Sequence, residues 1–206
     1  IDEYVRDVGI IEGGKHVRVP ALSGLEKIEF PGVGILEAFY TDGLRTLVDS
    51  IPGVDEMWEK TLRYPGHVEK VKLLRDLGFF DDKPVPVSGI EVQPRLVTAR
   101  ILERTLWNPE IRDLVAMLIE VKGESSGDAR GYRYTLLDRF NQKTQVTAMA
   151  RTTAYTASIV AGMVSKGMIK GPGVIPPERL GMDHELIQGL MTALGKRGIT
   201  IEETKI

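Results

Sequence analysis

The sequence contains no cysteine, and this absence excludes several kinds of chemistry at once. A chain without thiols forms no disulfide, has no cysteine nucleophile and binds no metal through thiolate. The absence is in keeping with a reducing compartment, so we expect a cytoplasmic protein. Only three histidines are present, and no two of them have the spacing of a metal site. The sequence therefore predicts no metal centre.

Long apolar runs and an excess of charge are also absent. No run approaches the ~18 apolar residues needed to cross a bilayer, and the first residues have none of the features of a signal peptide. The 27 Lys and Arg residues nearly balance the 29 Asp and Glu residues, which leaves a formal net charge of -2. We therefore expect neither a membrane nor a nucleic acid as a partner.

The loops that bind nucleotide phosphates are missing as well. A dinucleotide-binding domain begins with a strand and then Gly-x-Gly-x-x-Gly at the start of a helix. The Gly-x-Gly sequences at 32–34 and 171–173 lack the third glycine, and there is no P-loop. We expect the chain not to bind a nucleotide by either route. Because it also starts at Ile1, in what reads as helix interior, we interpret it as part of a longer protein.

The patterns that are present predict an α+β fold. Glycine turns between alternating apolar residues favour hairpins, and helical spacing of apolar residues favours helices that cluster late in the chain. Strands are expected over 10–19 and 85–92 as hairpins, and over 25–30, 35–40, 57–64, 114–122, 132–140 and 199–201. Helices are expected over 44–49, 67–77, 94–106, 152–166 and 183–196. The strands should form a largely antiparallel sheet, with a soft boundary near Val146.

The segment Arg63-Tyr64-Pro65-Gly66-His67 lies at an expected strand-to-helix junction. Free N–H groups at a helix start attract a carboxylate or phosphate, and an arginine adds a charge-assisted contact to the same anion. Gly66 lets a ligand approach the backbone, and His67 can act as an acid, a base or a hydrogen-bond donor. The simpler alternative is that Arg63 pairs with a nearby acid and that Pro65 and Gly66 form a turn.

A polar loop follows the strand that ends at Tyr40. Its residues Thr41, Asp42 and Gly43 occupy a place where substrate contacts often lie, although an ordinary turn explains them equally well.

Arg151 immediately precedes the expected late helix and has no evident packing reason, which makes it a functional candidate. Thr152 and Thr153 have the character of N-cap groups. Along this helix, small residues recur at helical spacing between 154 and 165 and would allow close approach of another element. Packing in a core is the simpler explanation of that stripe.

Together these segments resemble the saccharopine dehydrogenase-like family, and most closely its lysine 6-dehydrogenase branch. The matching stretches are residues 36–41, 61–70, 146–156 and 173–178, in the order of the family. The form Arg-Tyr-x-Gly-His is similar to the lysine branch, whereas saccharopine-forming members tend to have an aromatic residue at the position of His67.

The resemblance implies a glyceraldehyde-3-phosphate-dehydrogenase-like C-terminal domain. Residues 1–146 would bind substrate and form a homodimer through the sheet. Residues 147–206 would supply helices that return to pack on a Rossmann domain, which this sequence lacks apart from those helices.

For an intact protein, the resemblance implies NAD- or NADP-dependent oxidative deamination of L-lysine at its ε-amine, giving a semialdehyde that can cyclise. The nucleotide would be bound mainly by the missing Rossmann domain, so the chain alone is expected to be inactive. The alternatives are a saccharopine reductase, which joins glutamate to the semialdehyde, and a non-catalytic dimerisation or ligand-binding module.

Under this resemblance, the candidate residues fall into three groups. Arg63 would bind the substrate carboxylate with help from the helix start, and Asp42 would hold an ammonium group. The substrate-binding candidates are Arg63, Gly66, Tyr40, Thr41 and Asp42. The catalytic candidates are His67 and Tyr64. The cofactor-binding candidates are Arg151, Thr152 and Thr153.

Overall fold

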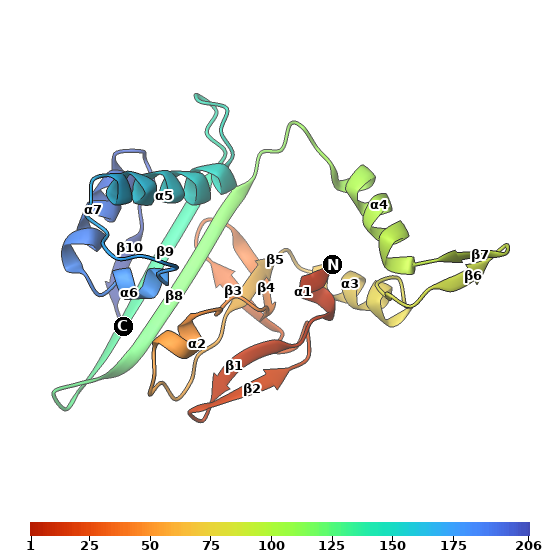
Figure 1. The fold of residues 1–206 in the computed structure, drawn as a ribbon, viewed down its shortest axis with the longest axis horizontal. Coiled ribbons are helices and arrows are strands. Elements are labelled where there is room, and N and C mark those ends of the chain that lie inside the picture. Colours follow the sequence, from red (N-terminus) through yellow and green to blue (C-terminus); the bar gives the residue numbers. More distant parts are fainter. The chain divides into compact units, whose positions relative to one another are not determined.

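Every strand pair in the computed structural model, which describes residues 1–206, is antiparallel. The mixed α+β architecture is therefore confirmed, although the strands form four small sheets instead of one (Figure 1). Two of the sheets are isolated hairpins and two have three strands. Their orders are β1-β2, β3-β4-β5, β6-β7 and β10-β9-β8.

The chain divides into two compact units between Pro109 and Glu110. We had placed a soft boundary near Val146, at the end of the expected strands. The difference arises because the long hairpin of β8 (Leu114–Ser125) and β9 (Asp128–Arg139) shares a core with the late helices. The functional assignment of residues 1–146 and 147–206 stays a prediction.

Unit 1, residues 1–109, contains most of the short elements. They are α1 (Asp2–Val5), β1 (Val8–Glu12), β2 (Lys15–Val19), β3 (Glu26–Phe30), β4 (Gly34–Tyr40), α2 (Leu47–Ser50), β5 (Lys60–Arg63), α3 (His67–Asp76), β6 (Val85–Val87), β7 (Ile90–Val92) and α4 (Pro94–Leu106). The first hairpin forms as predicted, because Gly13 and Gly14 adopt φ of 56° and 73° in its turn. β5 starts later than expected, since Met57 pairs with Ile11 in an isolated bridge.

The core of unit 1 forms around Phe39, which is fully buried in β4. Val68 and Val71 of α3 pack with Phe39 in one cluster that Leu22 and Phe80 complete. Val68, Val71 and Leu74 of the spacing that predicted α3 therefore lie on the face that it buries, whereas Leu73 and Leu77 are 60% and 65% exposed. This packing fixes the start of α3 beside β4 and β5.

Unit 2, residues 110–206, holds the longest strands and the longest helix. Besides β8 and β9, its elements are α5 (Ala148–Ser165), α6 (Pro177–Leu180), α7 (His184–Gly195) and β10 (Glu202–Lys205). α5 starts four residues before the expected position, because Asp113 accepts from the N–H groups of Ala148 and Met149 and the Thr147 hydroxyl accepts from the N–H of Ala150. A strand was expected over residues 199–201, but β10 begins at Glu202, directly after that range.

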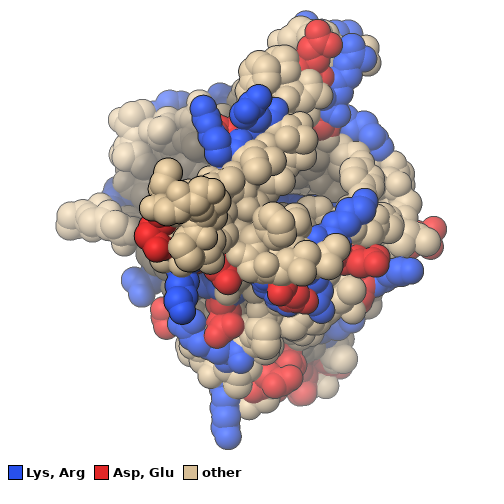
Figure 2. All heavy atoms as spheres, turned by 90° about the vertical axis from the view of Figure 1, so that its right-hand side faces the viewer, with Lys and Arg blue, Asp and Glu red and all other residues tan.

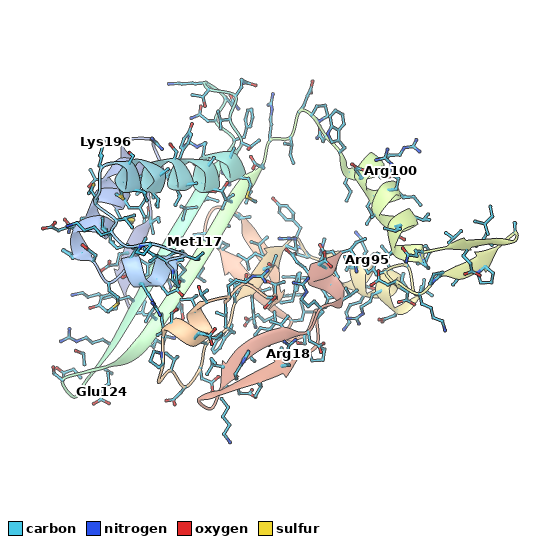
Figure 3. All side chains as sticks on the ribbon, in the orientation of Figure 1. Arg18, Arg95, Arg100, Met117, Glu124 and Lys196 are labelled. Carbon is cyan, nitrogen blue, oxygen red and sulfur yellow. The ribbon has the colours of Figure 1, made fainter.

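The core of unit 2 lies between the sheet and the two longer helices. Ile159 and Met163 of α5 pack there with Leu186 and Leu194 of α7, and Met117 of β8 contacts the same cluster (Figure 3). The stripe of small residues on α5 lies on another side of the helix, and most of its members are exposed. Our interpretation of that stripe as core packing is therefore wrong within this chain.

Charged residues of both signs are interspersed over the face shown in Figure 2, as the near-balance of the composition leads one to expect. None of the helices is both long and apolar enough to span a bilayer.

Candidate functional site

The pairing of β4 with β5 places two of the candidate residues of unit 1, Thr41 and Arg63, on one face of a sheet. Glu37 is opposite Arg63 and Phe39 is opposite Thr61, and the N–H of Thr41 extends the pairing by bonding to the carbonyl of Glu59 at 3.3 Å. Directly opposed residues share a face, as do residues two apart on one strand. We call this set the ladder; its members are Glu37, Phe39, Thr41, Glu59, Thr61 and Arg63.

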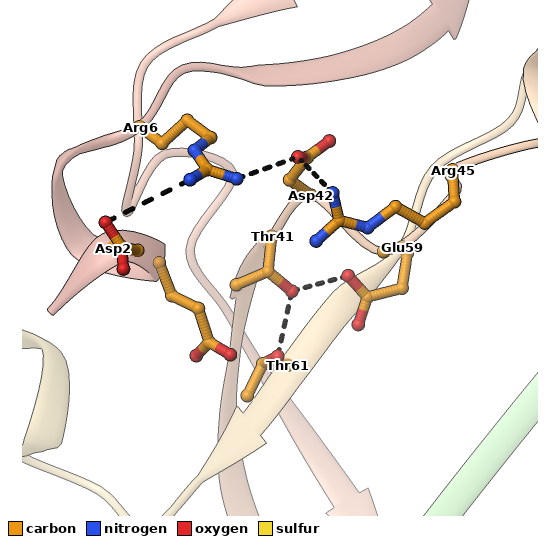
Figure 4. A pocket seen from close by; sticks show the side chains of 9 residues that line it. Asp2, Arg6, Thr41, Asp42, Arg45, Glu59 and Thr61 are labelled. Carbon is orange, nitrogen blue, oxygen red and sulfur yellow. Dashed lines mark hydrogen bonds and ion pairs between the residues drawn. The ribbon is translucent and has the colours of Figure 1, made fainter.

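A cavity of about 440 Å³ opens at the end of the ladder (Figure 4). Its lining combines four carboxylates with two guanidinium groups, so its formal charge is -2. We call it the acidic pocket; it is lined by Asp2, Glu3, Arg6, Thr41, Asp42, Gly43, Arg45, Glu59 and Thr61. The predicted candidates Thr41 and Asp42 therefore do line a cavity.

A chain of hydrogen bonds runs along the floor of the acidic pocket. The Thr41 hydroxyl is buried and donates to Oε2 of Glu59 at 2.5 Å. Its oxygen also lies 2.8 Å from the hydroxyl oxygen of Thr61. A hydroxyl has one hydrogen to donate, so Thr61 must be the donor to Thr41. The two threonines thus fix one carboxylate oxygen of Glu59, and the backbone N–H of Gly43 donates to the same carboxylate.

Glu59 is one of several residues of this site that the sequence alone did not identify, together with Glu3, Arg6, Arg45 and Thr61. Burial raises the pKa of Glu59 above the ordinary value, and the negative charge of Glu3 acts in the same direction. The hydrogen bond from Thr41 and the charge of Arg63 oppose this change. A Cβ at Gly43 would lie 2.5 Å from Oε2 of Glu59, so a larger residue there would displace this carboxylate. The structure thus packs the backbone closely around a half-buried carboxylate.

Asp42 lies at the rim of the acidic pocket between two arginines. Its Oδ2 is 3.1 Å from Nη1 of Arg45 and 3.7 Å from Nη1 of Arg6 (Figure 4). Tyr40 is different, because it faces the other side of the sheet, where Nζ of Lys60 lies 4.6 Å from its ring centroid. Tyr40 therefore does not line the acidic pocket.

The start of α3, which we expected to bind an anion, already holds one from the protein itself. The carboxylate of Glu37 accepts from the N–H of Gly66 at 2.9 Å and from the N–H of Val68 at 3.3 Å. These bonds, the first above all, lower the pKa of Glu37. Gly66 supports the arrangement with φ of 84°. Two of the donors that we expected to face a substrate thus have an internal partner.

Arg63 and His67 lie on the same side of the sheet but do not line the acidic pocket. Nη1 of Arg63 donates to the carbonyl of Leu62 at 2.9 Å, and its Nη2 lies 3.6 Å from Glu3. The alternative of a pairing with a nearby acid is therefore present in the structure. Glu3 itself lines the pocket, so Arg63 is one contact removed from it.

The His67 ring stacks on Phe39 and meets the Tyr4 hydroxyl. Its Nε2 is 3.1 Å from Oη of Tyr4, and its ring centroid is 6.5 Å from that of Phe39. Burial lowers the pKa of His67, and the charge of Arg63 adds to this effect. The Tyr64 side chain is 62% exposed. The structure therefore brings Thr41, Arg63 and His67 to one side of the sheet and leaves Tyr64 in solvent.

Arg151 has a packing reason that its sequence neighbours do not reveal. Its side chain is 7% exposed, and Nε donates to Asp138 at 2.8 Å. Nη2 donates to the carbonyls of Gly198, at 3.0 Å, and Arg197, at 3.4 Å. This interpretation of Arg151 corrects the one drawn from the sequence.

Thr152 and Thr153 are inside α5 and do not cap it. Their hydroxyls donate to the carbonyls of Ala148, at 3.0 Å, and Met149, at 2.5 Å. Both hydroxyl hydrogens are thus used within α5, and the assignment of the two threonines to a cofactor stays a prediction. No group of three or more His, Asp or Glu side chains has the arrangement of a metal site.

Comparison with known proteins gives one family. The family model of the saccharopine dehydrogenase C-terminal domain matches residues 1–199. Saccharopine dehydrogenase (NADP(+), L-glutamate-forming) of Schizosaccharomyces pombe is 26% identical over 130 residues, which are 63% of this chain and 28% of that protein.

A solved structure is similar over nearly the whole chain. The apo histidine-tagged saccharopine dehydrogenase (L-Glu forming) from Saccharomyces cerevisiae matches with a TM-score of 0.73 at 20% identity, over 97% of this chain and 59% of that one. This likeness shows a shared fold. The chain spans less than two thirds of the length of either relative.

Proposed function

Because this chain belongs to the saccharopine dehydrogenase C-terminal domain family, we propose that it is the substrate-binding part of an NAD- or NADP-dependent amino-acid oxidoreductase. The family resemblance expected from the sequence is confirmed by the family model and by the similar structure. The substrate and the reaction are the parts that we add to this membership.

The acidic pocket is the observation that carries the proposal. Its volume of about 440 Å³ falls in the range of small-molecule sites, roughly 300–1,000 Å³. An amino acid has an ammonium group and a carboxylate, and the pocket contains carboxylates that can pair with the first and guanidinium groups that can pair with the second. Glu59 and Asp42 are placed to bind an ammonium group, and Arg45 and Arg6 are placed to bind a carboxylate at the rim.

L-Lysine is the substrate that the charge of the acidic pocket favours. Lysine has two ammonium groups and one carboxylate at neutral pH, so its net charge is opposite to the formal charge of -2 in the lining. Opposite charges brought together in a partly buried site attract more strongly than in water. The form of the segment from Arg63 to His67 supports the same choice.

In this proposal, the chain binds the amine and moves its proton. Hydride transfer from the carbon that bears the amine is the chemistry that the nicotinamide nucleotide supplies. Before the hydride leaves, the ε-ammonium must lose a proton, and Oε1 of Glu59 is the acceptor we assign. Its raised pKa brings it closer to the operating pH, which suits a general base. The fixed position of Glu59 contributes orientation as well.

Saccharopine is the second candidate substrate, because the relatives named above act on it. Its three carboxylates outnumber its two amine charges, so it would enter a pocket of the same sign of charge. Binding of saccharopine would therefore depend on arginines outside the acidic pocket, of which Arg63 is the nearest candidate.

The test is a kinetic comparison with the complete protein that contains this chain. We expect turnover of lysine with NAD or NADP, and a KM for lysine at least about tenfold higher in Glu59→Gln, since a hydrogen bond to a charged group contributes about 1.5–3 kcal/mol. Glu29→Gln, an exposed change on β3, is the matched control and should leave KM unchanged. Arg63→Ala should lower kcat/KM if Arg63 binds the substrate carboxylate.

Three outcomes contradict the proposal. Turnover of saccharopine alone identifies the second candidate. Saturable lysine binding without turnover of either compound identifies a non-catalytic ligand-binding module. Unchanged kinetics in Glu59→Gln removes Glu59 from the site.

We also propose that the complete protein is a homodimer that pairs through a sheet of this chain and that it works in the cytoplasm. Light scattering of the purified protein tests the first part, and a monomer at micromolar concentration contradicts it.

A further inference from the structure

A second hollow, within unit 2, has a charge opposite to that of the acidic pocket. It measures about 440 Å³, and its lining contains cations and neutral polar groups but no carboxylate. We call it the basic hollow; it is lined by Asn141, Thr144, Arg151, Tyr155, Ser158, Lys196 and Arg197. Lys196 is labelled in Figure 3.

Arg151 contributes a guanidinium group to the basic hollow, and only two of its three nitrogens are hydrogen-bonded within the protein. Asp138 and two backbone carbonyls occupy Nε and Nη2. No hydrogen bond from Nη1 to a protein atom is present. Nη1 is also not among the buried polar atoms that lack a partner. The side chain is 7% exposed, and Arg151 is one of the residues that line the hollow.

Arg197 is oriented by Tyr155. Its Nη1 donates to the carbonyl of Tyr155 at 3.1 Å, and its guanidinium carbon lies 5.2 Å from the centroid of the Tyr155 ring. Lys196 precedes it at the end of α7, where a helix C-terminus favours cations. Neither side chain has an acidic partner. With Asp138 balancing Arg151, the hollow retains two uncompensated positive charges.

Neutral donors complete the lining. Oδ1 of Asn141 accepts from the N–H groups of Lys143 and Thr144, each at 3.0 Å. The amide nitrogen of Asn141 is thereby left to donate. The hydroxyls of Thr144 and Ser158 add two further groups that can donate to an anion.

We propose that the basic hollow binds a phosphate group, either free or as a monoester. A phosphate dianion matches the two uncompensated charges, and its tetrahedral oxygens can accept from donors that approach from several directions. The donors here come from α5, from the end of α7 and from the turn at 141–144. A planar carboxylate would use fewer of them. The proposal is independent of the proposed function, since no residue is shared with the acidic pocket.

The experiment is a titration of the isotopically labelled 206-residue chain with inorganic phosphate, followed by amide chemical shifts. We expect saturable shifts at residues 141–144 and 196–198. Lys196→Gln and Arg197→Gln should each weaken binding about tenfold or more, as expected for loss of a charge-assisted hydrogen bond. Lys166→Gln, at the end of α5 and outside the hollow, is the matched control and should bind like the wild type.

Adenosine monophosphate and adenosine distinguish the two sources of phosphate. Tighter binding of the monophosphate than of inorganic phosphate assigns the site to an ester, and the reverse assigns it to the free ion; adenosine should not shift these residues. The absence of saturable shifts with phosphate and with the monophosphate overturns the proposal. Equal affinity in the wild type and both glutamine variants overturns it too. Arg197→Gln keeps the backbone carbonyl that Arg151 binds, so the fold should survive.

Discussion

The two arginines that the sequence marks as functional candidates, Arg63 and Arg151, have different surroundings in the structure. The first lies on the ladder, beside a cavity that remains open. The second is buried and is neutralised by Asp138. An arginine near the start of a helix can therefore be exposed beside a pocket or buried in an ion pair, and the location of its acidic partner decides between the two. For Arg151 that partner is 13 residues away in sequence, on the strand that precedes the helix.

The largest expected effect is loss of stability when Arg151 is removed. Arg151→Met leaves the carboxylate of Asp138, whose side chain is 12% exposed, without its counter-charge. We therefore expect the free energy of unfolding, measured by urea titration, to fall by about 3–5 kcal/mol. Arg130→Met, exposed on β9, is the control and should change it by less than about 0.5 kcal/mol. A loss as small as that of the control would show that the ion pair does not stabilise unit 2.

The double variant sharpens the same comparison. Asp138→Leu combined with Arg151→Met removes both charges, so part of the stability lost in the single variant should return.

A smaller loss is expected at Glu37, the member of the ladder that caps α3. Glu37→Ala removes the acceptor of two N–H groups, and such a cap contributes about 1 kcal/mol. The lowered pKa means that the folded chain binds fewer protons than the unfolded chain. This contribution is therefore present above the ordinary carboxyl pKa and is lost as pH falls through the lowered one. The cost of Glu37→Ala, measured by unfolding at pH 7 and pH 3, should shrink at the lower pH. A cost that does not vary with pH would contradict the capping role.

The smallest expected effect concerns Glu59, whose pKa shift has the opposite sign. Because its pKa is raised, the folded chain binds more protons than the unfolded one, and the associated stability is lost as pH rises through the raised pKa. The difference in melting temperature, Glu59→Gln minus wild type, should therefore increase as the pH rises from 4 to 7. A constant difference across this range would show that Glu59 titrates as it does in the unfolded chain. Glu29→Gln again serves as the control.

The sequence predicted most of the elements because their signals are local. The glycines at 13 and 14 predict the first hairpin, and the apolar spacing of α3 predicts the face that it buries. The start of α5 was misplaced, because Asp113 accepts from its first N–H groups from 35 residues away in sequence. The long β8–β9 hairpin exceeded the prediction because a two-residue turn at Ser126 and Gly127 replaced the expected loop.

The candidate site was predicted only in part for the same reason. Thr41 and Asp42 follow a recognisable strand and were found, whereas Glu59 matters because it is opposite Thr41 in the pairing of two strands. No pattern within residues 57–64 marks Glu59 as different from other acids. The Glu37 carboxylate that accepts from the start of α3 is likewise separated from its two donors by 29 and 31 residues in sequence.

The residues of the ladder share one face of the sheet only as long as the register between β4 and β5 is kept. One residue inserted between Thr41 and Glu59 could be absorbed by the loop that carries α2, but one inserted between Glu59 and Arg63 would shift the pairing by one step. A shift of one step turns every following side chain to the other face of a sheet. Thr61 and Arg63 would then face the side of Tyr40 and Lys60, and the hydrogen-bond chain to Glu59 would be cut. Substitutions can tune this site one position at a time, whereas insertions and deletions within β5 should abolish it in one step.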